Sequence, residues 1–166
     1  MVCWLLGLLI FSYSAKAQTS ACVIPAPNVG CTPPATFDQS RVVTGDVTWA
    51  SLGLGSADNV TQTIRITGTG KVRVESINLI LKSSNAVIYI DGVELIVENG
   101  NLQMDASGSR FLMTNGILRT SGNYQQTTNT ITCITSSTVD IGEEIAGVQF
   151  APGNVGTSAN FQNDGG

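Results

Sequence analysis

The residues of this sequence that could carry chemistry are its carboxylates, because the chain contains no histidine. Without imidazole, the Ser-His-Asp and Cys-His arrangements of nucleophilic catalysis are excluded, as are zinc sites that need histidine. Glu75 and Asp91 are 16 residues apart, each following a short apolar segment. If two strands make one coil, these two side chains stack about 5 Å apart, a distance that suits a retaining glycosidase or a Ca²⁺ site.

Both carboxylates also have a structural interpretation, and we favour it. Asp91 precedes Gly92 in an Asp-Gly turn, and Glu75 occupies the equivalent corner. Glu94 lies in a strand-like segment, where a charged side chain keeps an outer face or an edge soluble. We therefore predict no catalytic, cofactor-binding or metal-binding residue, and no cofactor. Glu75, Asp91 and Glu94 remain candidates for the case that the chain is an enzyme.

A regular spacing of eight residues defines the elements that would position these groups. Small or turn-forming residues recur at this interval, and Asp-Gly and Asn-Gly pairs, which favour tight turns, lie among them. The repeated positions are Gly68, Ser76, Ser84, Gly92, Gly100, Gly108 and Gly116. Six residues separate successive turns, which is the usual length of a strand and too short for a helix. The segment from about Val60 to Asn123 is therefore predicted to be a stack of short strands.

The apolar residues alternate along each segment, and the parity of the alternation changes from one segment to the next. This change indicates a 16-residue repeat of two strands, with ladders in which equivalent residues stack. The predicted ladders are Leu79–Leu95–Phe111 and Val72–Ile88–Met104.

Two architectures fit this pattern: a β-solenoid, or parallel β-helix, and an antiparallel meander with one apolar face, as in a β-sandwich. Apolar residues also recur on the opposite parity, at Ile64, Ile80, Ile96 and Leu112. A one-sided sheet would leave them in water, so the pattern favours the all-β solenoid with an 8/16-residue period. A three-sided coil of about 24 residues also stays open.

The chain is expected to have three regions. Residues 1–17 are typical of a secretory signal peptide, because an apolar segment from Trp4 to Tyr13 precedes a small-x-small cleavage site that ends at Ala17. Residues 18–40 form a Cys/Pro-rich leader or N-terminal cap, and residues 41–166 form the repeat region, which is expected to continue beyond the chain. No span of membrane-crossing length follows the signal, so a secreted or cell-surface location is predicted.

The cysteine content fits an exported protein. Three cysteines follow the signal: Cys22, Cys31 and Cys133. Cys22 and Cys31 are the disulfide candidates, because they would close a short proline-rich loop. Cys133 is then a buried small hydrophobic residue, or it pairs with a cysteine beyond this chain.

The composition limits the possible partners. The formal net charge is −4 and only 12% of the residues are charged, where about 25% is usual. An acidic and sparsely charged surface argues against nucleic-acid binding, which needs basic patches.

The turns and strands from Ile88 to Gln103 and from Phe111 to Leu118 resemble the parallel β-helix repeats of secreted bacterial surface proteins, including adhesins. The resemblance implies a non-enzymatic, exported solenoid with a structural or adhesive role, whose partner is an extracellular glycan or a host or cell surface. Two alternatives stay open: a polysaccharide-active lyase or hydrolase on a β-helix, and a carbohydrate-binding β-sandwich.

Overall fold

The computed structural model describes residues 29–75, 77–142 and 160–164. The predicted signal peptide, residues 1–17, and residues 18–28 of the predicted leader lie outside these residues. Within the described ranges the chain is almost entirely β-structure, with three single-turn 3₁₀ helices: η1 (Val29–Cys31), η2 (Ala50–Leu52) and η3 (Ala57–Asn59). No helix among the described residues is both long enough and apolar enough to cross a membrane.

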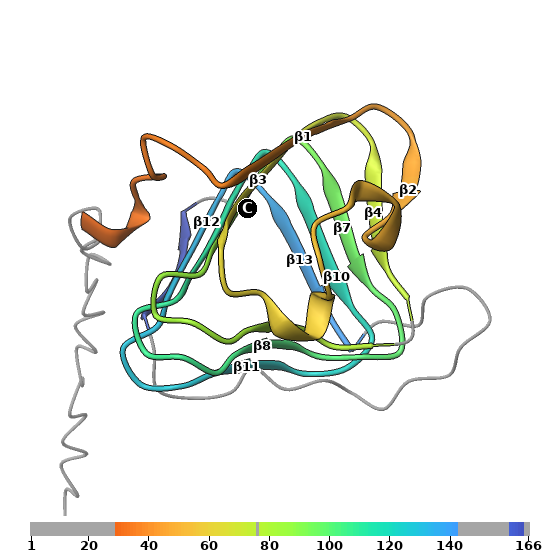
Figure 1. Ribbon diagram of the computed structural model, residues 1–166. Coiled ribbons are helices and arrows are strands. Elements are labelled where there is room, and N and C mark those ends of the chain that lie inside the picture. Colours follow the sequence, from red (N-terminus) through yellow and green to blue (C-terminus); the bar gives the residue numbers. More distant parts are fainter. Residues whose placement is uncertain (1–28, 76, 143–159, 165–166) are drawn as a thin grey trace, which may run out of the picture.

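The strands form three sheets that make the sides of a triangular coil (Figure 1). Sheet A contains β1 (Gln39–Val43), β3 (Thr63–Gly68), β6 (Val87–Asp91), β9 (Arg110–Thr114), β12 (Ile131–Thr135) and β14 (Asn160–Asp164). Sheet B contains β2 (Asp46–Thr48), β4 (Lys71–Val74), β7 (Glu94–Val97), β10 (Ile117–Thr120) and β13 (Thr138–Ile141). Sheet C contains β5 (Leu79–Leu81), β8 (Leu102–Met104) and β11 (Tyr124–Gln126).

Every strand pairs in parallel with the strand one turn away, for example β3 with β6 and β4 with β7. The β-solenoid prediction is therefore confirmed, and the antiparallel meander and the β-sandwich are wrong. Parallel neighbours need a crossover, which the other two sides of the triangle provide.

The 16-residue repeat is also wrong, because one turn has three sides. Val72 pairs with Leu95 and Leu95 with Leu118, a spacing of 23 residues, whereas Ile64 and Ile88 are 24 apart. Each eight-residue segment is thus one side of the triangle. At some corners an odd number of positions separates the last inward residue of one side from the first inward residue of the next. The inward positions then change between even and odd residue numbers, as they do from Ile90 to Val93. The change in alternation is visible in the sequence. It marks a corner of the triangle and does not show that a turn consists of two strands.

The interior is built from ladders that differ from the predicted ones. Leu79 stacks on Leu102, and Ile88 stacks on Phe111; all four side chains are fully buried. The predicted ladders Leu79–Leu95–Phe111 and Val72–Ile88–Met104 do not form, because their members lie on different sides of the triangle. Stacked apolar side chains at a strand spacing of about 4.8 Å leave no room for water between turns.

The connection between β2 and β3 takes the place of a sheet C strand in the first turn. It contains η2 and η3, and Val60 at its end forms a parallel bridge with Leu81. Its Trp49 and Leu54 are 3% and 2% exposed and belong to the apolar core, and the Trp49 indole N–H donates a hydrogen bond to the Gly55 carbonyl at 3.1 Å. This connection therefore contributes large side chains to the apolar core beside the first described strands.

The apolar residues of opposite parity are covered in different ways. Ile64 points into the interior and is fully buried. Ile96 lies on the outer face of sheet B between Arg73 and Arg119, and is only 3% exposed. The aliphatic parts of the two arginine side chains can cover it while their guanidinium groups reach water. Leu112, 2% exposed, lies under the N-terminal segment described next.

Candidate functional site

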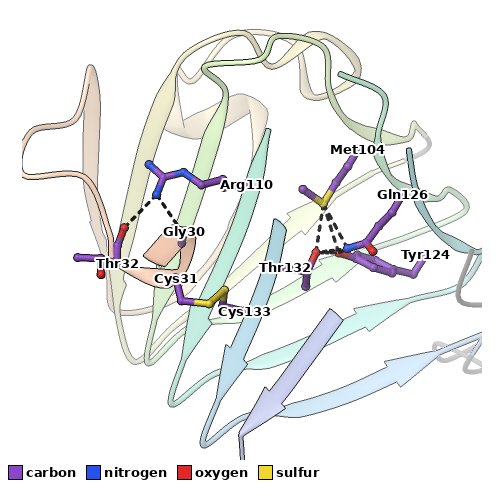
Figure 2. The surroundings of a disulfide bond; sticks show 9 residues. All are labelled: Gly30, Cys31, Thr32, Met104, Arg110, Tyr124, Gln126, Thr132 and Cys133. Carbon is purple, nitrogen blue, oxygen red and sulfur yellow. Dashed lines mark hydrogen bonds between the residues drawn. A yellow bond between two sulfur atoms is a disulfide. The ribbon is translucent and has the colours of Figure 1, made fainter. Parts of the chain in front are cut away.

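The N-terminal strap, residues 29–38, crosses the outer face of sheet A and is bonded to it (Figure 2). A disulfide joins Cys31 to Cys133 in β12, with the two Cα atoms 5.6 Å apart and a sequence separation of 102. The predicted Cys22–Cys31 pair is therefore wrong, because Cys31 is already bonded; Cys22 lies outside the described residues. Cys133 is buried in β12, as predicted, but it is not unpaired and its partner does not lie beyond this chain.

Further contacts hold the strap along its length. The Nη1 atom of Arg110 donates hydrogen bonds to the carbonyl oxygens of Gly30 and Thr32, each at 3.0 Å. A Cβ at Gly30 would lie 2.1 Å from the Cδ1 atom of Ile131, so glycine permits this close approach. Phe37 stacks on Tyr89 with ring centroids 6.1 Å apart.

The strap ends at a hydrogen-bonded carboxylate. The Asp38 carboxylate accepts hydrogen bonds from the Thr63 backbone N–H at 2.8 Å and from the Thr63 hydroxyl at 2.9 Å. These bonds, the backbone one foremost, hold the pKa of the Asp38 carboxyl below its usual value.

The strap covers a small apolar cluster. Val87, Leu112 and Cys133 are at most 6% exposed, and the partly buried Tyr89 and Ile131 pack against them. This cluster explains why apolar residues occupy outward-facing positions in β6, β9 and β12.

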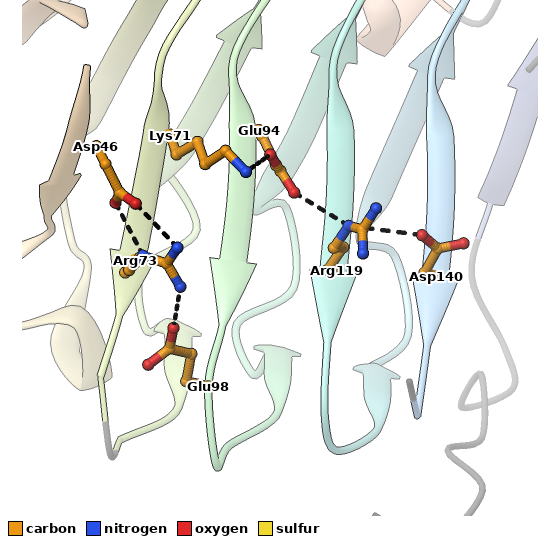
Figure 3. Close-up of polar contacts among 7 residues, drawn as sticks. All are labelled: Asp46, Lys71, Arg73, Glu94, Glu98, Arg119 and Asp140. Atoms are coloured by element: carbon orange, nitrogen blue, oxygen red, sulfur yellow. Dashed lines mark hydrogen bonds and ion pairs between the residues drawn. The ribbon is translucent and has the colours of Figure 1, made fainter. Parts of the chain in front are cut away.

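Ion pairs connect neighbouring strands on the outer face of sheet B (Figure 3). Arg73 in β4 donates from Nε and Nη2 to the two carboxylate oxygens of Asp46 in β2, at 2.8 and 2.9 Å. Its Nη1 donates to Glu98, which follows β7, at 2.6 Å. The hydrogen bonds from Arg73 hold the pKa of the Asp46 carboxyl below its usual value, and the same bonds raise the pKa of Arg73.

A second chain of charges runs along the same face. Glu94 in β7 forms ion pairs with Lys71 in β4 at 2.8 Å and with Arg119 in β10 at 3.0 Å, and Arg119 lies 3.7 Å from Asp140 in β13. The Glu94 side chain is only 14% exposed. Each pair contributes little alone, about 0–1 kcal/mol when exposed, but alternating signs one strand apart favour this register.

The three carboxylates considered for catalysis do not come together in one ladder. Glu75 follows β4 at the corner between sheets B and C, whereas Asp91 ends β6 at the corner between sheets A and B. Asp91 accepts a hydrogen bond from the Asn115 side chain at 3.3 Å. Continuing the β4–β7 register by one residue places Glu98, and not Asp91, beside Glu75. The predicted stacking of Glu75 on Asp91 is wrong because it depended on the two-strand coil.

A polar cluster lies inside the solenoid, among side chains of β8, β11 and β12 (Figure 2). The Gln126 side-chain amide donates to the Tyr124 hydroxyl at 2.7 Å, and both residues contact the Thr132 hydroxyl. The Tyr124 hydroxyl also lies 3.3 Å from the sulfur of Met104. Burial raises the pKa of Tyr124, with the hydrogen bonds to Thr132 and Gln126 acting in the opposite direction.

Sequence reasoning did not find this cluster. The repeat spacing loosens beyond Asn123, and the Thr- and Gln-rich segment that follows contains no alternation of apolar residues. In the structure this segment still supplies β11 and β12, whose inward positions include the polar Gln126 and Thr132 as well as the apolar Ile134.

The described residues contain no group of three or more cysteine, aspartate and glutamate side chains placed to hold a metal ion. Comparisons with family models, with curated proteins and with solved structures find no match to this chain.

Proposed function

We propose that this chain is an exported β-solenoid that acts at a cell surface as a structural or adhesive element, without turning over a substrate. The observation that carries the proposal is the Cys31–Cys133 disulfide. It joins the N-terminal strap to β12, the fourth strand after β1 in sheet A. Disulfides of this structural kind persist in oxidising compartments outside the cytosol. The signal-like residues 1–17 in the sequence support the same location.

The use of charge supports a scaffold role. Asp46, Glu94, Glu98 and Asp140 bind arginine or lysine side chains on neighbouring strands, so these carboxylates stabilise the register of sheet B. A general acid in a glycosidase instead needs a raised pKa beside a second carboxylate. The pKa shift at Asp46 is in the opposite direction.

Fractionation of the source cells tests the location. We expect the chain in the surface or extracellular fraction, with its N-terminus near Gln18 and with Cys31 joined to Cys133 in peptide mapping without reduction. A cytosolic chain that retains Met1 and has reduced thiols would contradict the proposal.

Incubation with polysaccharides tests the absence of turnover. We expect no release of reducing ends or unsaturated products from pectin, xylan or cellulose. Turnover by the wild-type chain that is lost on changing Glu75 to Gln and Asp91 to Asn would favour the enzyme alternative, because these changes keep the shape and remove the acid–base groups.

A further inference from the structure

A hollow of about 490 Å³ lies where the first turn departs from the regular coil. Its lining comes from η3, from β5 and the residues next to it, and from the corner that leads from β7 to β8; η3 packs against β5. Its lining residues are Asp58, Ile77, Asn78, Ile80, Lys82 and Asn99. A second, smaller hollow, lined in part by Trp49 and Glu75, adjoins it through the shared residue Ile77.

The lining offers both hydrogen-bond donors and acceptors. Asn78 accepts a hydrogen bond from the Asn101 backbone N–H at 2.8 Å through its side-chain oxygen, so its NH₂ group is the part that can donate to a ligand. Asn99 is exposed and adds a second amide, and the Asp58 carboxylate adds an acceptor that already binds the Ser56 hydroxyl.

The hollow also has an apolar side. Ile77 is 40% exposed, whereas the neighbouring Ile80 is 7% exposed. Val42 and Ile77 are the exposed large hydrophobic residues of the described part of the chain. A single exposed aliphatic side chain is too small for a protein interface, which buries about 800 Å² on each partner. It suits the C–H face of a sugar ring, whose hydroxyl groups both donate and accept.

The charges around the hollow exclude a strongly acidic ligand. Lys82 is 2.6 Å from Asp105, so its charge is already balanced. Asp58 and, in the adjoining hollow, Glu75 add negative charge, and the whole chain carries −4. Like charges repel an acidic polysaccharide.

From this geometry we propose that the hollow around Ile77 binds a neutral oligosaccharide. The inference rests on the adhesive form of the proposed function and names the ligand class and the site. A saccharide ring lies against Ile77, and its hydroxyl groups bind the amides of Asn78 and Asn99 and the carboxylate of Asp58.

Calorimetric titration of the purified chain with four neutral hexasaccharides, of glucose (cellohexaose), mannose, xylose and N-acetylglucosamine, tests the proposal. We expect saturable binding of at least one of them, and weaker binding of hexagalacturonic acid. Changing Asn99 to Gly should weaken the binding about tenfold, because the variant loses a hydrogen bond to the ligand that contributes about 1.4 kcal/mol of binding free energy. Changing Ile77 to Ser should weaken it by a similar factor.

Matched controls separate loss of the site from loss of the fold. Asn99 has a φ of 57° and Asn129, which does not line the hollow, has a φ of 61°. Glycine adopts this left-handed conformation readily, so both Asn→Gly variants should fold, and only the one at position 99 should bind more weakly. Val42→Ser is the corresponding control for Ile77→Ser, since Val42 is 76% exposed and does not line the hollow.

The outcomes distinguish this inference from the proposed function. Failure of all four neutral oligosaccharides to bind, or binding that Asn99→Gly and Ile77→Ser leave unchanged, would overturn the saccharide site. Tighter binding of hexagalacturonic acid than of any neutral probe would overturn it as well. None of these results would alter the cell fraction in which the chain is found, which tests the proposed function separately.

Discussion

At the scale of single residues, the interior changes character along the solenoid axis. In sheet C, Leu79 stacks on Leu102, and Leu102 stacks on Tyr124 one turn later. All three side chains are fully buried. In sheet A, Ile88 and Phe111 are followed by Thr132. The polar groups of this last turn bind one another, which offsets the cost of removing them from water.

The raised pKa of Tyr124 leads to a prediction for alkaline solution. A group whose pKa is higher in the folded than in the unfolded state keeps its proton on folding, so its contribution to stability is present below the unfolded value, about 10, and is lost as the pH rises above it. We expect the folded wild-type chain to lose stability above that pH, and Tyr124→Phe to lose less. Unfolding monitored by circular dichroism gives the stability, and absorbance at 295 nm reports tyrosine ionisation.

The comparison of the two titrations isolates this side chain. The difference in absorbance at 295 nm between the wild type and Tyr124→Phe should rise only at the pH at which the chain unfolds. A difference curve with a midpoint near 10 in a chain that stays folded would contradict the burial of Tyr124.

At the scale of elements, the strap and sheet A depend on each other. The strap covers an apolar strip that would otherwise face water, and the strip gives the strap a surface on which its disulfide and the contacts of Arg110 can form. Because Cys31 of η1 and Cys133 of β12 are separated by 102 positions along the chain, the disulfide removes much of the entropy of the unfolded state.

Replacing both Cys31 and Cys133 by Ala should therefore lower the free energy of unfolding by about 2–5 kcal/mol, with the strands retained. Denaturant titration under non-reducing conditions measures the change. Cys22→Ala is the control and should change the stability by less than about 0.5 kcal/mol, because Cys31 pairs with Cys133. An equal loss in Cys22→Ala would contradict the pairing.

At the scale of the whole molecule, the solenoid is close to one-dimensional. Each turn contacts the turns before and after it, so the inner turns have two neighbours and the outer strands of each sheet have one. In sheet B, β7 lies between β4 and β10, whereas β2 and β13 are at the two ends of the described strands.

We expect amide hydrogen exchange to follow this order. The amides of β6 and β7 should exchange most slowly and those of β2 and β13 fastest, because β2 and β13 each pair with one described strand, and local opening costs less for a strand with fewer paired neighbours. Mass spectrometry of peptides after exchange measures this gradient. On reduction of the disulfide, exchange should increase most in η1 and β12; uniform protection of all turns would contradict the one-dimensional description.

The positions of turns and the inward alternation were predictable from the sequence, because both are local. An Asp-Gly or Asn-Gly pair allows a tight turn whatever lies elsewhere in the chain, and Asn99, Asn115 and Gly92 do have positive φ angles. Alternation along a strand needs only the two faces of that strand, so residues such as Ile88 and Leu95 were correctly predicted to be buried. The all-β class follows from these two local signals, whereas the choice of a solenoid over a meander rested on the apolar residues of opposite parity, such as Ile96 and Leu112.

The number of sides in each turn, the partner of Cys31 and the pairing of charges were decided by the tertiary structure. The first and the last depend on which residue of one turn lies beside which residue of the next, a relation between positions about 23 residues apart that no local pattern encodes. The disulfide joins residues 102 positions apart, which only the folded chain brings together. Whether Glu75 lies beside Asp91 or beside Glu98 follows from that register alone. Parallel strands acquire their register from packing and hydrogen bonds between turns, and these exist only once the coil has closed.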